Sequence, residues 1–177
     1  MTNINSIYNF VNHLRKKANL KKVLNTKDLI NLITVLGGKI NFKDMSFDID
    51  GIINNINENK FEIILNKKFL DNKKLNFLIT HELGHLFIHM KFLNPKIWQE
   101  NFEYIDSTFY RQEYIREEIE ANEFAFELLM PKNEFIKKAK DFSNHNKCNI
   151  EKLAEFFNVS SEIVLSRGEN LGIFIVD

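Results

Sequence analysis

The sequence contains little cysteine and no net charge. Its 177 residues include a single cysteine, Cys148, which excludes a disulfide framework and a cysteine-based metal cluster. Lys plus Arg and Asp plus Glu both number 24, so a broadly basic nucleic-acid-binding surface is not expected, although a local basic patch remains open. No apolar run is long enough to cross a bilayer, and the first residues show no signal-peptide pattern. We therefore expect a cytoplasmic protein.

The order of the predicted elements indicates an α+β fold, mainly helical. Helical patterns occupy residues 6–14, 26–36, 71–93, 112–130, 132–141 and 149–157, and a last helix follows Ser160 or Ser161. The segments Gly51–Asn54 and Lys60–Leu65 predict paired strands, and Lys39–Phe42 and Ser46–Ile49 are short and β-compatible. Together they predict a small three-stranded sheet, antiparallel or mixed. Residues 96–110 have no clean period and fit a loop or a short helix. We expect a main domain over residues 1–148, including the N-terminal helices, with a helical segment of residues 149–177 packed on it.

One motif in this sequence carries recognisable chemistry, the H-E-x-x-H of His81 to His85. Two histidines four residues apart differ by about 40° around a helix and by about 6 Å along it, so both imidazoles can reach one metal ion. Glu82 lies about 100° from His81, beside that ion, where it can take a proton from a bound water molecule. Two nitrogens, one carboxylate and an open position suit Zn²⁺.

The surroundings of the motif strengthen this interpretation. From Phe77 to Ile88 nearly every residue outside the motif is apolar, which predicts a helix buried on all sides. Buried polar groups without partners cost about 1–3 kcal/mol each, and a metal ion would satisfy both histidines and the glutamate. The alternative is a chance match whose histidines bond to backbone carbonyls, and the burial of this helix argues against it.

The helix predicted over residues 112–130 offers a third metal ligand. Its core-facing stripe consists of Ile115, Ile119, Asn122, Ala125, Phe126 and Leu129. Glu118 falls within this stripe and needs a cation or a donor, either the metal or an arginine such as Arg111 or Arg116. Asn122, one turn later, can hydrogen-bond a ligating histidine. Four other glutamates are expected to face solvent: Glu117, Glu120, Glu123 and Glu127.

His89 continues the row of His81 and His85, but we predict that it supports a ligand rather than acting as one. The extended pattern H-E-x-x-H-x-x-G-x-x-H would need Gly at Ile88 and His at Lys91. A zinc hydrolase also needs a group that stabilises the developing oxyanion or contacts the substrate. The candidates precede or open the Glu118 helix, and the sequence does not choose among them: Tyr104, Tyr110, Arg111 and Tyr114.

Three blocks that occur in this order resemble the ImmA/IrrE metallopeptidases: His81-Glu-Leu-Gly-His-Leu-Phe-Ile-His89, Glu118-Ile-Glu-Ala-Asn-Glu-Phe-Ala125 and Glu127-Leu-Leu-Met-Pro131. The resemblance covers roughly residues 20–172. It implies a compact zincin-like domain in which one zinc ion is held by His81, His85 and Glu118, with Glu82 as general base. It also implies a cytoplasmic regulatory peptidase that cleaves a helix-turn-helix repressor of a mobile element or a stress response.

The C-terminal segment departs from this resemblance. Residues 150–171 have the outline of a helix-turn-helix, but Arg167 is the one basic residue between Val164 and Asn170. Because DNA reading needs basic side chains on the second helix, we predict a structural or partner-docking role and no direct DNA binding.

The working hypothesis is peptide hydrolysis, with the substrate extended along Lys60–Leu65 or Gly51–Asn54 as an edge of the sheet. Two alternatives stay open. One is a general cytosolic oligopeptidase. The other is a metal-stabilised binding module without activity, which would sequester a repressor or serve as a toxin–antitoxin partner.

Overall fold

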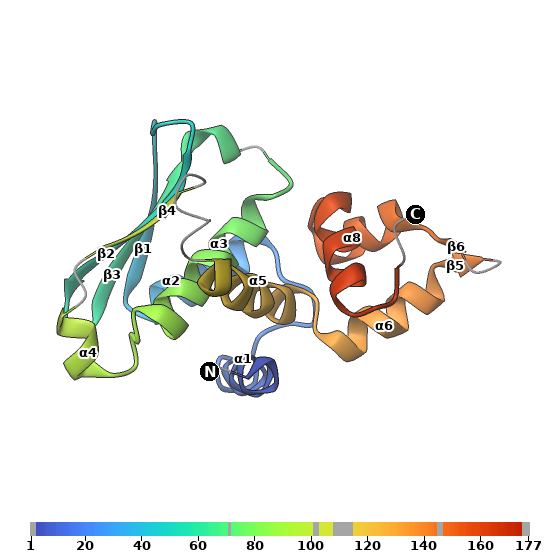
Figure 1. The fold of residues 1–177 in the computed structure, drawn as a ribbon, viewed down its shortest axis with the longest axis horizontal. Helices are drawn as coiled ribbons and strands as arrows, with labels where there is room; N and C mark the ends of the chain where they lie inside the picture. Colours follow the sequence, from blue (N-terminus) through green and yellow to red (C-terminus); the bar gives the residue numbers. More distant parts are fainter. Residues whose placement is uncertain (1–2, 71, 101–102, 108–114, 145–146, 175–177) are drawn as a thin grey trace.

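The computed structural model describes residues 3–70, 72–100, 103–107, 115–144 and 147–174. Figure 1 shows a sheet at one end of the molecule, the C-terminal helices at the other, and helices α3 and α5 between them. This arrangement confirms the α+β class. None of the helices within the described residues combines the length and the apolar character that crossing a membrane would require.

The two N-terminal helices begin at asparagine caps. Helix α1 (Ile4–Lys17) follows Asn3, whose side chain accepts a hydrogen bond from the backbone N–H of Asn5. Helix α2 (Thr26–Val35) follows Asn25, which forms a reciprocal capping box with Asp28. These caps satisfy backbone donors that the first turn of a helix leaves open, and so they place both helix starts.

The sheet is mixed, one of the two arrangements predicted, but within the described residues it has four strands rather than three. Strands β1 (Gly38–Lys43), β2 (Ile49–Asn57), β3 (Lys60–Asn66) and β4 (Glu103–Ser107) lie in the order β1-β3-β2-β4. Strand β1 runs parallel to β3, and β2 runs antiparallel to β3 and β4. The proposed edge template was wrong, because β2 and β3 are both flanked by other strands. The region without a clean period contains helix α4 (Pro95–Glu100) and strand β4, which is the edge next to β2.

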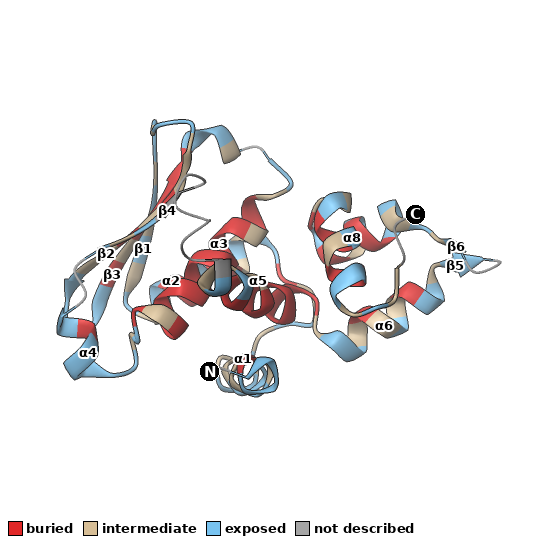
Figure 2. Cartoon of the chain, in the orientation of Figure 1, coloured by how far each residue is buried: buried red, intermediate tan, exposed pale blue. Residues whose placement is uncertain are grey.

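Helix α3 (Leu75–Gly84) is the buried centre of the fold. All its residues except the half-buried Phe77 are buried, as the apolar surroundings of the motif predict. The helix contacts β2 and β3 on one side and α5 on another, so water is excluded around it (Figure 2). A short 3₁₀ turn (Lys67–Phe69) precedes it, and one π-helical turn (His85–His89) continues it.

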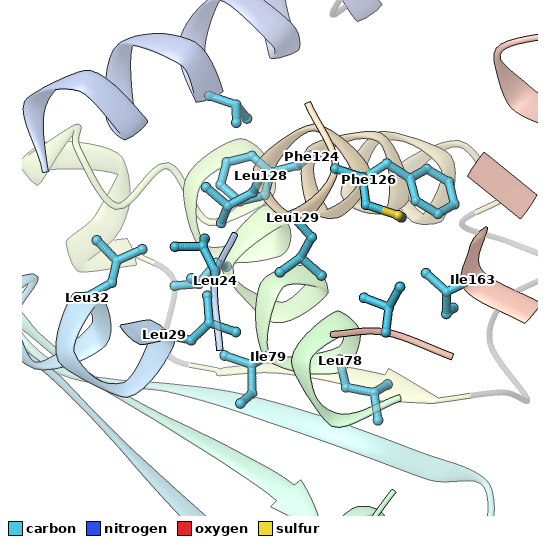
Figure 3. Packing of buried hydrophobic residues seen from close by; sticks show 14 of the residues in the cluster. Leu24, Leu29, Leu32, Leu78, Ile79, Phe124, Phe126, Leu128, Leu129 and Ile163 are labelled. Atoms are coloured by element: carbon cyan, nitrogen blue, oxygen red, sulfur yellow. The ribbon is translucent and has the colours of Figure 1, made fainter. Parts of the chain in front are cut away.

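Helix α5 (Ile115–Leu129) is buried on more sides than the sequence pattern indicates. Phe124, Phe126, Leu128 and Leu129 all pack into the core (Figure 3). The expectation of a solvent-facing row was wrong, because Glu120, Glu123 and Glu127 are only 8%, 1% and 3% exposed. Ile119, predicted to face the core, is 49% exposed. The reason is that α5 is covered by α1 and α3, and that α8 supplies a cation to Glu123 and Glu127.

That cation belongs to the C-terminal part of the chain. This part comprises α6 (Lys132–Asp141), the short strands β5 (Ser143–Asn144) and β6 (Lys147–Cys148), α7 (Ile150–Phe157) and α8 (Ser161–Asn170). Arg167 of α8 is fully buried, with Nη2 2.6 Å from Glu127 Oε2 and Nη1 3.6 Å from Glu123 Oε2. Its Nη1 also donates to the Tyr8 hydroxyl at 2.8 Å. The one basic residue in the α8 sequence therefore joins α8 to α5 and α1.

Candidate metal centre

A close crossing of α3 and α5 builds the site. A Cβ atom added to Gly84 would lie 2.9 Å from Cα of Ala121 and 3.0 Å from its carbonyl oxygen, nearer than such atoms can pack. Glycine and alanine at this crossing therefore allow the two helix backbones to approach. Since Glu118 lies one turn before Ala121, the crossing brings its carboxylate to the histidines of α3.

His81, His85 and Glu118 converge on one point. The two Nε2 atoms are 2.9 Å apart, and each lies 3.3 Å from a different oxygen of Glu118. One potential ligand atom from each residue lies within 4.8 Å of the others, so the trio could hold a metal ion. Arg116, an alternative partner for Glu118, instead contacts Glu120, with Nε 3.1 Å from Oε1.

Hydrogen bonds on the far side of each imidazole orient the histidines. His81 Nδ1 lies 2.9 Å from Asn122 Oδ1, which can only accept, so this nitrogen carries the proton. His85 Nδ1 lies 2.8 Å from Nδ1 of His89, and His89 Nε2 lies 3.5 Å from Glu120 Oε2. The π-helical turn carries His89 into this position. When His85 Nδ1 donates to His89, both Nε2 atoms present lone pairs to the centre.

The donor set fits a cation. Two imidazole lone pairs and a carboxylate within 2.9–3.3 Å repel one another unless a positive charge lies among them. Burial lowers the pKa of His85 to about 3, so this ring stays neutral, as a metal ligand must. Burial by itself raises the pKa of Glu118, but the interactions with the His81 and His85 side chains outweigh it and leave that pKa below its usual range. The carboxylate is therefore ionised.

We expect Asn122→Ala to weaken metal binding by about 10- to 100-fold, because His81 loses the acceptor that holds its tautomer and ring orientation. Competition with a chromophoric zinc chelator would measure the affinity. Ile119→Ala is a matched control on the same helix, since Ile119 is 49% exposed and is not one of the three clustered residues. An affinity unchanged by Asn122→Ala would show that this contact does not support the ligand.

Glu82 lies on the side of α3 that faces the sheet. Its side chain is fully buried. A Cβ atom added to Gly51 of β2 would lie 2.0 Å from Glu82 Oε1 and 2.6 Å from Cδ. The glycine therefore leaves the space that this carboxylate fills.

We expect Gly51→Ala to lower the hydrolytic activity that the H-E-x-x-H motif predicts by more than tenfold without loss of metal, because the new methyl group occupies the position of the Glu82 carboxylate. Steady-state kinetics together with metal analysis of the same sample would separate these two effects. Asn54→Ala is the control, because the Asn54 amide lies on the same strand and points to Glu62 instead. Equal activities for the two variants would contradict a positioning role for Gly51.

Tyr104 is the one oxyanion or substrate candidate that lies within the described residues. Its ring stacks on His85 with centroids 4.3 Å apart, and its hydroxyl donates to Glu117 Oε2 at 3.1 Å. These contacts connect β4 to His85 and to Glu117 of α5, so β4 lies beside the cluster of His81, His85 and Glu118. The other three candidates lie outside the described residues: Tyr110, Arg111 and Tyr114.

Sequence reasoning missed several contributors to the site. Gly51 and the Gly84–Ala121 pair act by being small, and Glu120 acts through His89. The small residues inside the two motif blocks were a usable signal for a close helix crossing. Gly51 had no such signal, because only the packed structure places β2 over Glu82.

A buried histidine pair facing a carboxylate on a second helix, beside a mixed sheet, defines a metallopeptidase-type domain. The peptidase family model described as the IrrE N-terminal-like domain matches residues 39–168, so the chain belongs to that family. The match confirms the family resemblance stated from the sequence blocks. No curated protein matches the chain.

Proposed function

We propose that this protein is a zinc-dependent endopeptidase of regulatory type. The observation that carries this proposal is the convergence of His81, His85 and Glu118, with potential ligand atoms within 4.8 Å of one another and Glu82 buried alongside. Two nitrogens and one carboxylate with a fourth position open form the ligand set of catalytic zinc sites. Membership of a peptidase family supports the same reaction.

The chain's own residues would divide the work as follows. His81, His85 and Glu118 would hold the ion, and Asn122 and His89 would keep the imidazoles in the ligating tautomer. Bound zinc would supply a Lewis acid that polarises the scissile carbonyl and lowers the pKa of water. Glu82 would take the proton from the attacking water and pass it to the leaving amine.

The substrate that we propose is a helix-turn-helix repressor of a mobile element or a stress response. This part of the proposal rests on the resemblance to the ImmA/IrrE metallopeptidases. Strand β4 (Glu103–Ser107) is the edge strand beside the centre, because β2 covers its other side and Tyr104 reaches His85. An extended substrate segment could add to this edge and be presented to the metal.

The test is incubation of the purified, zinc-loaded protein with a helix-turn-helix protein encoded beside its gene. We expect one defined cut in that protein by mass spectrometry, abolished by a chelator, restored by zinc and absent from a panel of unrelated peptides. Cleavage of many panel peptides would instead favour a general oligopeptidase. Tight binding without any cut would favour the inactive binding module.

A further inference from the structure

We infer that a cavity between α3, α5 and α8 is the pocket that selects the substrate, and that it takes a large apolar side chain next to the scissile bond. This inference rests on the proposed peptidase function. The cavity has a volume of about 580 Å³. Its lining includes His81, Glu118 and Asn122, so it opens directly onto the metal centre.

Next to the metal centre, one wall of the cavity is apolar. Phe77 touches His81, with ring centroids 6.1 Å apart, and also Phe126, at 5.3 Å. Leu78 and Ile163 complete this wall from α3 and α8. An aromatic and aliphatic surface that begins at a ligating histidine would gain most from an apolar side chain, because burial of apolar area is favourable in proportion to that area.

The charge at the cavity rim is consistent with an apolar occupant. Glu162 lines the cavity, but its Oε2 lies 2.6 Å from Lys74 Nζ, so its charge is paired. A bound cation would neutralise Glu118. The side chain that enters therefore meets no unpaired negative charge from these two carboxylates, and a Lys or Arg would lose hydration there without gaining an ion pair.

The wall formed by α8 is held in place by the buried Arg167 cluster. Arg167 joins α8 to Glu127 and Tyr8, and Asn170 donates a hydrogen bond to Glu123. Ser166, which lines the cavity, is the neighbour of Arg167 along the chain. The helix that has the outline of a DNA-recognition helix thus faces the metal centre, where its side chains can contact a peptide.

Binding can test the pocket separately from catalysis. The sample is the zinc-loaded Glu82→Gln protein, and the probes are fluorescein-labelled octapeptide pools in which one position is Ala, Leu, Phe, Lys or Asp and the others are mixed. Fluorescence anisotropy would measure the dissociation constants. We expect one position at which Phe or Leu binds about tenfold or more tightly than Ala. Adding Ser166→Trp, which fills the cavity, should remove that preference.

Leu165→Trp is the matched control, because Leu165 is the adjacent residue, is 38% exposed and does not line the cavity. It should keep the preference. If Ser166→Trp does not fold, Ile163→Ala widens the same wall and should reduce the preference at least threefold. The inference is overturned if no apolar preference exists, or if these variants leave it unchanged. Failure of the wild-type protein to cut the helix-turn-helix protein encoded beside its gene would contradict the proposed function, while the binding preference would still be measured.

Discussion

Replacing Glu82 by glutamine is expected to lower peptide hydrolysis by about 10²- to 10⁴-fold while the metal content stays the same. Glutamine matches glutamate in shape and fits the space beside Gly51, but it cannot accept a proton from water. The proposed metal ligands His81, His85 and Glu118 are untouched by this change. The loss should therefore appear in kcat rather than in folding or in zinc affinity.

The measurement pairs initial rates on a cleaved substrate with metal analysis and thermal melting of the same protein. Glu100→Gln, an exposed carboxylate on α4, is the control and should retain full activity. Unchanged hydrolysis in Glu82→Gln would remove the general base from the mechanism. A regulatory effect that persists in cells carrying this variant would favour the binding module over the enzyme.

Removal of the Glu118 carboxylate is expected to weaken zinc binding by more than about 100-fold, and activity should fall with it. Loss of a contact beyond the ligands already costs about 10- to 100-fold, and Glu118 is proposed as a ligand itself. Without this carboxylate, two of the three proposed ligands remain, the neutral imidazoles of His81 and His85, whose Nε2 atoms are 2.9 Å apart. No negative charge from Glu118 then stabilises the cation. Zinc titration of Glu118→Ala would measure the change.

Glu120→Ala provides the comparison on the same helix. Glu120 lies 3.5 Å from His89 and 3.1 Å from Arg116, so its effect on zinc should be indirect and no more than about tenfold. A thermal shift on zinc addition should be clear for Glu120→Ala and small for Glu118→Ala, because a ligand stabilises the fold only where it binds. Equal losses of zinc affinity in the two variants would show that Glu118 is not the third ligand.

Helix α8 both attaches the C-terminal part of the chain to α5 and lines the cavity beside the metal centre. Arg167 is fully buried, so it holds α8 against α5 and is not exposed to a DNA phosphate. Breaking a buried ion pair is strongly destabilising, since it leaves an uncompensated charge in the core. The same contact keeps Ile163 and Ser166 at the edge of the metal centre, where they line the cavity proposed to select the substrate.

Local patterns in the sequence were enough to predict the buried helix that carries the H-E-x-x-H motif and the chemistry that the motif suggests. The apolar run around His81 and His85 indicated a helix buried on all sides, and the structure has that burial. Helical spacing alone placed Asn122 one turn after Glu118, and its amide lies 2.9 Å from His81. Periodicity worked here because both helices are regular and each contributes one face to the site.

Periodicity gave a wrong burial pattern for α5 and missed one strand of the sheet. A periodic pattern gives one buried face, yet α5 is covered from several sides, so Glu123 and Glu127 are buried against Arg167. That partner is 40 residues away from Glu127 and could not be seen from spacing. Strand β4 was missed because it lies at an edge, where side chains need not alternate between core and solvent.

The sequence by itself predicted the kind of chemistry, since two histidines and a glutamate on adjacent turns of a buried helix need a partner such as a metal ion. It also determined the fold class and the family. Only the tertiary structure decided how closely Glu118 approaches the histidines, which strand borders them and where the cavity beside them lies. Those outcomes depend on contacts between distant segments, above all the close approach of Gly84 to Ala121, and no local pattern specifies such a distance.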